Sequence, residues 1–291
     1  MYKLVATDCD GTFIDSKGWL PEENKIAFQR LHQRGIPVVL VTGRNDFLTK
    51  DYVDELGFQC PVIGGNGATL GNIYTGERKY VNAMTREEMN GVFDICDKFK
   101  VPCKVFTTEK CYTNDIDLKN GGIKLITVKY TKPIKTTIEN ILETDIRKTV
   151  DFKNVIKVVV IEDNIEFLTE IKDAINEKVK TVTAIQSNWN CIDIVKKGVS
   201  KGAALLKYGE MLGIKPEDII AFGDSENDVS MIKAVGGGYA IGNADQCVKD
   251  VAKYIADTND NCGVAKVLDK EFNLGIYQLL KGDYRQPQRD S

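Results

Sequence analysis

Short apolar runs alternate with segments of helical periodicity at both ends of this chain. Near the N-terminus, apolar runs at 3–7, 36–41 and 61–63 flank helical patterns at 21–34 and 45–56. The same alternation resumes over 200–270. Parallel strands are joined by crossover helices, and such a sheet buries both of its faces. The alternation therefore predicts an α/β fold with a doubly wound parallel sheet.

The middle of the chain has a different pattern. Strand-like runs at 104–107, 112–113, 124–130 and 155–161 are mixed with helical patterns at 85–98, 134–146 and 164–178. Because 291 residues are many for one core, we expect an inserted α+β domain at 83–189 within a discontinuous core of 1–82 and 190–282. The polar segment 283–291 has no periodicity and is expected to be a flexible tail.

Charge and hydropathy exclude several classes of partner. The formal net charge is −3, so no basic surface is predicted for nucleic acid or for an anionic membrane. The most apolar early run, 36–41, is far shorter than the roughly 20 residues of a membrane helix. Charged residues also precede any apolar stretch long enough for a signal peptide, so we expect a cytoplasmic protein.

Histidine and cysteine usage limits the chemistry further. The only histidine is His32, in a polar helical segment, which excludes a Ser-His-Asp or Cys-His triad and a histidine-rich metal site. The eight cysteines are scattered without a Cys-x₂-Cys pair, so we expect thiols rather than disulfides or a zinc site. A redox role remains an alternative for Cys9. An enzyme of this composition would depend on carboxylates, lysine, hydroxyl groups and a hard metal ion.

The first motif, Asp8-Cys9-Asp10-Gly11-Thr12, directly follows the first apolar run. Residues at the carboxyl end of a parallel strand lie in the crevice where open α/β sheets bind ligands. Two carboxylates at positions i and i+2 of an extended chain point the same way, and a glycine permits a sharp turn. The motif therefore suits divalent-metal binding combined with acid–base chemistry, although an ordinary acidic turn has the same composition.

Two later segments have the composition of phosphate and metal sites. Thr42-Gly43-Arg44 ends the second apolar run, and a hydroxyl beside glycine N–H groups at a strand end can bind phosphate. The segment 223–228, Gly-Asp-Ser-Glu-Asn-Asp, places three acids and an amide between an apolar strand and a helix. Such crowding is costly unless a cation neutralises it, and oxygen ligands without cysteine or histidine favour Mg²⁺.

These three segments and the run 199–202, Val-Ser-Lys-Gly, resemble in order the four sequence motifs of the haloacid dehalogenase superfamily. Asp-x-Asp-Gly-Thr matches the first motif, Thr42 the second, Lys201 in Val-Ser-Lys-Gly the third, and Gly-Asp-x-x-Asn-Asp the fourth. The long interval between the second and third motifs resembles the Cof-like subgroup, which implies a C2-type cap inserted into a Rossmann-like core. The run 64–68, Gly-Gly-Asn-Gly-Ala, also resembles the Asn-Gly-Ala segment of that subgroup.

The resemblance implies a role for each matched residue. Asp8 would be the nucleophile, Asp10 the general acid and then the general base, and Lys201 the cation that neutralises nucleophile and phosphate. The residues implied to bind phosphate or substrate are Thr42, Gly43, Arg44, Asn66 and Asn227. The residues implied to hold or support Mg²⁺ are Asp8, Asp10 through its backbone carbonyl, Asp224 and Asp228.

The implied function is Mg²⁺-dependent hydrolysis of a small phosphorylated metabolite, such as a sugar phosphate, through an aspartyl phosphate. An acid at Asp10 disfavours the ion pumps of the superfamily, which carry a non-acidic residue there. Two alternatives stay open, a phosphomutase of related architecture and a non-catalytic phosphometabolite sensor. The inserted segment contains no motif that identifies the substrate.

Overall fold

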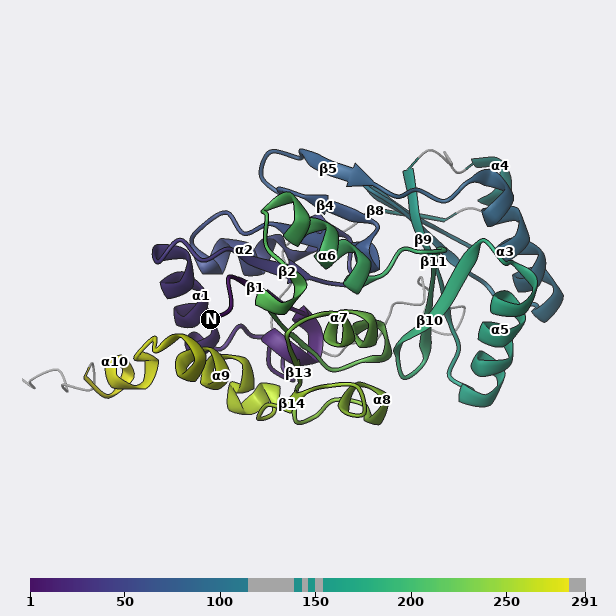
Figure 1. Cartoon of the computed structure of the whole chain (residues 1–291). Helices are drawn as coiled ribbons and strands as arrows, with labels where there is room; N and C mark the ends of the chain where they lie inside the picture. The colour runs from purple at the N-terminus through teal and green to yellow at the C-terminus, as the bar shows by residue number, and fades with distance from the viewer. Residues whose placement is uncertain (115–138, 143–145, 150–153, 283–291) are drawn as a thin grey trace, which may run out of the picture.

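The computed structural model describes residues 1–114, 139–142, 146–149 and 154–282. Two sheets lie side by side, each with its own helices (Figure 1). The larger sheet is built from the two ends of the chain, and the smaller sheet from its middle. This arrangement confirms the prediction of an α/β core with an inserted α+β domain.

In the part of the chain that the structure describes, the larger sheet has eight strands in the order β14-β13-β12-β1-β2-β3-β4-β5. Their bounds are β1 (Leu4–Thr7), β2 (Val38–Val41), β3 (Val62–Gly64), β4 (Thr69–Gly71), β5 (Arg78–Val81), β12 (Ile219–Gly223), β13 (Gly237–Ala240) and β14 (Tyr254–Ile255). The strands from β14 to β3 run parallel, and β1 pairs with β12 on one side and β2 on the other. The antiparallel strands β4 and β5 are not predicted by periodicity, because β4 is short and follows a glycine-rich run.

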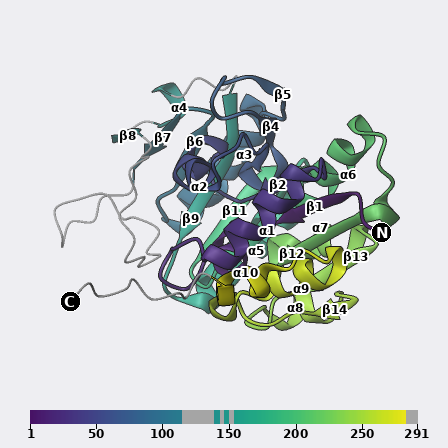
Figure 2. The same cartoon turned by 90° about the vertical axis from the view of Figure 1, so that its left-hand side faces the viewer.

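Helices cover both faces of the larger sheet. Their bounds are α1 (Glu22–Gln33), α2 (Lys50–Leu56), α6 (Lys201–Met211), α7 (Val229–Ala234), α8 (Gln246–Lys249), α9 (Gly263–Phe272) and α10 (Ile276–Gly282). On one face α1, α9 and α10 gather (Figure 2), and Phe28 and Leu268 pack in a core with Phe222. On the other face Leu205 of α6 and Ile232 of α7 share a second core. Burial of one large apolar side chain contributes about 1.5–3 kcal/mol to the stability of the fold. The two cores therefore hold the sheet that carries the site in place.

Among the described residues, the smaller sheet has six strands in the order β10-β11-β9-β6-β7-β8. Its elements are α3 (Arg86–Phe99), β6 (Lys104–Thr107), β7 (Lys110–Thr113), β8 (Glu139–Leu142), α4 (Ile146–Thr149), β9 (Val155–Ile161), α5 (Ile165–Lys178), β10 (Val182–Asn188) and β11 (Cys191–Lys196). Val92 of α3 and Ile171 of α5 pack with Val158 on one face. On the other face Val159 packs in a cluster with Ala68, which precedes β4 of the larger sheet. Side chains on that second face are therefore buried between the two sheets.

Some predictions need correction. The helix predicted at 134–146 is wrong at Glu139–Leu142, which forms strand β8 because these residues pair with β7. The strand predicted at 124–130 and the tail at 283–291 lie outside the described residues. Strand β11 follows the predicted boundary at 189/190, yet it pairs with β9 and β10. The division between core and insert stays a prediction. Because β11 pairs within the smaller sheet, we place the second boundary after β11.

Candidate active site

The candidate site lies at the carboxyl ends of three neighbouring parallel strands. Asp8 follows β1, Thr42 follows β2 and Asp224 follows β12. Parallel strands that pair side by side end at the same edge of the sheet, so residues far apart in sequence meet there. The N–H of Asp8 donates to the carbonyl of Phe222 at 3.0 Å, which continues the pairing of β1 with β12 up to the site.

A tight turn, Cys9–Phe13, brings the first motif against the fourth. Gly11 has a φ of +78°, in the left-handed region that favours glycine. A Cβ atom added at Gly11 would lie 2.5 Å from Oδ2 of Asp224. On the same turn, the hydroxyl of Thr12 donates to Oδ1 of Asp224 at 2.7 Å. The turn needs glycine because a larger residue would separate the two motifs.

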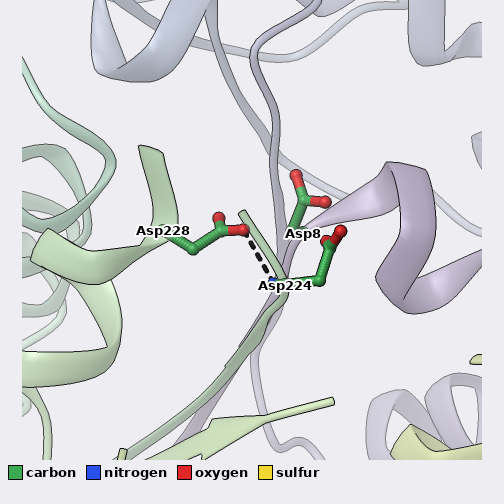
Figure 3. A group of neighbouring side chains, drawn as sticks. All are labelled: Asp8, Asp224 and Asp228. Carbon is green, nitrogen blue, oxygen red and sulfur yellow. Dashed lines mark hydrogen bonds between the residues drawn. The ribbon is translucent and has the colours of Figure 1, made fainter. Parts of the chain in front are cut away.

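Asp8, Asp224 and Asp228 form an acidic cluster (Figure 3). One carboxylate oxygen from each residue lies within 4.8 Å of the other two. Asp8 and Asp224 project from neighbouring strand ends, and Asp228 approaches from the start of α7. Oδ2 of Asp228 accepts a hydrogen bond from the N–H of Asp224 at 2.9 Å. Asp8 and Asp228 are buried, whereas Asp224 is partly accessible.

Lys201, at the start of α6, supplies positive charge to this cluster. Its Nζ donates to Oδ1 of Asp8 and to Oδ1 of Asp228, both at 2.6 Å. The hydroxyl of Ser200 caps the helix by accepting from the N–H of Ala203 at 3.1 Å, which fixes where the lysine emerges. Burial alone would lower the pKa of Lys201, but Asp228 and Asp8 raise it above its usual value. The ammonium group therefore stays charged.

The cluster remains short of positive charge, because it holds three carboxylates and Lys201 pairs with two of them, Asp8 and Asp228. Burial raises the pKa of Asp8 well above its usual range, although Lys201 opposes the shift. Burial and the charge of Asp228 raise the pKa of Asp224 to about 7. A divalent cation would remove the excess negative charge, and carboxylate oxygens suit a hard ion. Asp8, Asp224 and Asp228 therefore fit such an ion.

The carboxylate of Asp10 is held by Arg44. Nε of Arg44 donates to Oδ2 of Asp10 at 2.7 Å, and a second guanidinium nitrogen donates to Oδ1. The guanidinium also lies over the ring of Tyr52, 5.7 Å from its centre. Arg44, which is expected to bind phosphate, therefore pairs with Asp10, the proposed acid–base residue. The expected metal contact of Asp10 concerns its backbone carbonyl and stays a prediction.

The loop 42–44 is tied to neighbouring loops by hydrogen bonds. The N–H of Arg44 donates to the hydroxyl of Thr42 at 3.1 Å. Asn66 adopts a left-handed conformation, with φ +58°, and its N–H donates to the carbonyl of Thr42 at 3.0 Å. Nδ2 of Asn227 donates to Oδ1 of Asn66 at 3.0 Å. The residues expected to bind phosphate or substrate therefore lie together.

Two charged residues of the smaller sheet reach this loop, and no sequence motif predicts them. Lys157 on β9 donates through Nζ to the carbonyl of Gly43 at 2.8 Å and to Oδ2 of Asp193 at 3.0 Å. Asp193 on β11 also accepts from Nδ2 of Asn66 at 2.6 Å. Both charges lie inside strands that are otherwise largely apolar and buried. A charge inside a buried strand is the signal that could have identified them.

Cys9 and His32 are not members of the acidic cluster. Cys9 is 1% exposed, and burial together with the charge of Asp8 raises the pKa of its thiol well above the usual range. Oxidation and nucleophilic attack need the thiolate, so the environment of Cys9 disfavours the redox alternative. His32 is exposed and stacks on Phe58, with ring centres 4.1 Å apart.

The sequence comparisons agree with this geometry. The profile of the haloacid dehalogenase-like hydrolases matches residues 5–268. The 5-amino-6-(5-phospho-D-ribitylamino)uracil phosphatase YcsE of Bacillus subtilis is 28% identical, over 91% of this chain and 94% of its own length. The phosphatase YwpJ of the same organism is also 28% identical, over 91% of this chain and 98% of its own length.

Solved structures share the fold. Haloacid dehalogenase-like hydrolases from Bacteroides thetaiotaomicron and B. subtilis are each 25% identical to this chain, with TM-scores of 0.77 and 0.80. They cover 94% and 92% of this chain, and 100% and 99% of their own chains are matched.

The fold and the family profile define a hydrolase, and the carboxylate cluster is its candidate site. The chain belongs to the haloacid dehalogenase-like hydrolase family. The predicted class, a Cof-like phosphoric monoester hydrolase of that superfamily, is confirmed. The family implies a divalent metal ion, for which the acidic cluster offers ligands. In the part of the chain that the structure describes, no helix has the length and apolar character to cross a membrane.

Proposed function

We propose that this protein is a Mg²⁺-dependent phosphatase that hydrolyses small phosphomonoesters through an aspartyl phosphate on Asp8. The position of Asp8 carries the proposal. Its carboxylate lies with those of Asp224 and Asp228, and Lys201 donates to it at 2.6 Å. An ordinary acidic turn exposes its carboxylates to water. Burying several of them together is costly for stability, which favours a functional explanation.

Asp8, Asp224 and Asp228 would hold Mg²⁺, with the backbone carbonyl of Asp10. The ligand set contains only oxygen, which favours Mg²⁺ over zinc. When bound, the ion supplies positive charge that offsets the repulsion between the Asp8 carboxylate and an anionic phosphate.

Thr42 and Lys201 would bind the oxygens of the transferring phosphoryl group. The hydroxyl oxygen of Thr42 accepts from the N–H of Arg44, so its own hydrogen can be donated to a phosphate oxygen. Asp8 then attacks phosphorus in line, the bond from phosphorus to the leaving oxygen breaks, and an aspartyl phosphate forms. Attack of water on phosphorus releases inorganic phosphate and restores the carboxylate of Asp8.

Asp10 would handle the protons of both steps. It donates a proton to the leaving oxygen and then accepts one from the attacking water. In this structure both of its oxygens accept from Arg44, which fixes the orientation of the carboxylate that makes these transfers. Arg44 would therefore orient Asp10 as well as contribute positive charge near the phosphate.

The substrate class is proposed from the relatives. The name of YcsE gives a phosphorylated ribityl compound as its substrate. We propose a small phosphorylated sugar, polyol or similar metabolite as the substrate here. A panel of such compounds, including the ribitylaminouracil phosphate, tests this by release of inorganic phosphate with Mg²⁺ and with EDTA. No release from any compound in the presence of Mg²⁺ would contradict the proposal.

The same assay separates the alternatives. A phosphomutase would isomerise a sugar phosphate and release little inorganic phosphate. A sensor would bind a phosphorylated metabolite without turnover. The contact between Lys201 and Asp8 argues against a sensor, because a sensor needs no positioned nucleophile.

A further inference from the structure

We infer that Lys157 and Asp193, two buried residues of the smaller sheet, are positioning residues for the phosphate-binding loop of the larger sheet. The inference rests on the proposed function, in which Thr42 binds the phosphoryl group. Neither residue belongs to a motif of the sequence, and neither touches the acidic cluster through a hydrogen bond of the described residues.

The two side chains form an ion pair between adjacent strands. Lys157 lies on β9 and Asp193 on β11, and Nζ of the lysine is 3.0 Å from Oδ2 of the aspartate. Their side chains are only 6% and 2% exposed. A buried ion pair seldom stabilises a fold more than apolar residues of similar size would, so stability does not explain this pair.

Lys157 and Asp193 make further hydrogen bonds to loops of the larger sheet. Nζ of Lys157 donates to the carbonyl of Gly43 at 2.8 Å, and Oδ2 of Asp193 accepts from Nδ2 of Asn66 at 2.6 Å. Asn66 in turn accepts from Nδ2 of Asn227, next to Asp228 of the acidic cluster. The pair therefore has its polar partners only while the smaller sheet packs against the loops of the larger one.

The carbonyl of Gly43 and the N–H of Arg44 belong to one planar peptide group, so a contact that fixes the carbonyl also fixes the N–H. That N–H donates to the hydroxyl oxygen of Thr42 at 3.1 Å. Lys157 thus orients the Thr42 hydroxyl through a single peptide group. Successive hydrogen bonds polarise one another, which strengthens the effect in a buried site.

The backbone at Gly43 allows this close packing. A Cβ atom added there would lie 3.0 Å from Oδ1 of Asn66 and 3.5 Å from Oδ2 of Asp193. The side chains that hold the loop therefore pack directly on the α-carbon of Gly43. It follows that packing of the smaller sheet and the geometry of the phosphate loop are coupled: the loop is fully oriented only when the smaller sheet is in place.

The experiment compares two variants with the wild type. Lys157→Met with Asp193→Asn removes both charges and keeps an amide oxygen that accepts from Asn66. The control is Lys172→Met. It removes a different contact between the parts of the chain that carry the two sheets, the ion pair of Lys172 with Glu226 at 3.5 Å. The full-length proteins are assayed with p-nitrophenyl phosphate and with the best sugar phosphate, and inorganic phosphate is used as a competitive inhibitor.

Because the double variant misplaces the phosphate loop, we expect kcat/KM to fall by about tenfold or more for both substrates. The inhibition constant of inorganic phosphate should rise, whereas the melting temperature should stay within about 3 °C of the wild type. Lys172→Met should change kcat/KM by less than about twofold. If the double variant does not fold, Lys157→Arg, which keeps the charge but changes the donor geometry, should show the same losses.

Two results would overturn the inference. One is a double variant, or a folded Lys157→Arg, as active as Lys172→Met, which would make the ion pair structural only. The other is a loss confined to the sugar phosphate, which would mean that the pair contacts the leaving group instead, for example through Oδ1 of Asp193, which is buried without a hydrogen-bond partner among the described residues. Failure of the proposed function looks different, because the wild type itself would then release no phosphate with Mg²⁺.

Discussion

Arg44 donates hydrogen bonds to both carboxylate oxygens of Asp10, and its Nε lies 2.7 Å from Oδ2. A guanidinium that contacts both oxygens fixes the plane of the carboxylate as well as its position. The side chain of Asp10 is 32% exposed, and this contact restricts its rotation. The second and first motifs are therefore joined by an interaction that sets the direction of the proposed acid–base group.

We expect Arg44→Lys to lower kcat for a sugar phosphate by about tenfold, because lysine cannot hold both oxygens of Asp10. The effect on p-nitrophenyl phosphate should be smaller, since its leaving group needs little protonation. Steady-state kinetics with the two substrates measures the difference. Equal losses would show that Arg44 acts on the phosphate alone.

Asp8→Asn should abolish turnover while the protein remains folded. An amide is a poor nucleophile, and removing one of three crowded carboxylates relieves repulsion, so the melting temperature should stay the same or rise. Phosphate release and circular dichroism on the same preparation test both points. A rate close to that of the wild type would exclude Asp8 as the nucleophile.

Asp10→Ala should leave metal binding intact and slow hydrolysis by a factor of about 10² to 10⁴ for substrates with alkoxide leaving groups. The activated aryl ester should lose less. Comparing kcat across esters of graded leaving-group pKa provides the measurement. A loss independent of the leaving group would count against the acid role.

Metal dependence should change with pH because the pKa of Asp224 is raised to about 7. Mg²⁺ needs the ionised carboxylate, so the concentration for half-maximal activity should increase as pH falls through about 7, by about tenfold per unit for one displaced proton. Titrations of activity with Mg²⁺ at several pH values test this. A constant requirement from about pH 8 to about pH 6 would contradict it.

The stability of the metal-free protein should increase as pH falls, whereas Mg²⁺ binding should weaken. Asp224 has a higher pKa in the folded state than the value of 3.8 that is usual for an aspartate exposed to water. The folded state therefore binds more protons than the unfolded state between these two pKa values. Its contribution therefore favours folding increasingly as pH falls from about 7 towards about 4. Mg²⁺ should stabilise the protein more at about pH 8 than at about pH 5.5, which thermal unfolding with and without the ion measures.

The carboxylate cluster could be predicted from sequence because each member follows a strand or begins a helix. Asp8 and Asp224 end strands that pair in parallel, so strand alternation alone brings them to one edge of the sheet. The order of the motifs along the chain identifies the members of the cluster. Their oxygen ligands indicate which kind of ion they would bind.

Lys157 and Asp193 could not be placed in the same way. Their contacts depend on how the smaller sheet packs against the larger one, and periodicity within a strand carries no information about that packing. The segment Glu139–Leu142 shows a second limit, since pairing with β7 overrides the helical periodicity around it. In both cases contacts between elements decide the outcome.

The central position of β1 has a consequence for biosynthesis. Leu4 at the start of β1 pairs with Ile219 of β12, so one side of the first strand stays unpaired until β12 has been synthesised. A growing chain carries Asp8, the proposed nucleophile, long before it acquires Lys201, Asp224 and Asp228. Chains that stop before β12 should consequently be inert as well as poorly folded, and catalytic competence should appear only after the segment that contains Asp228 has been made.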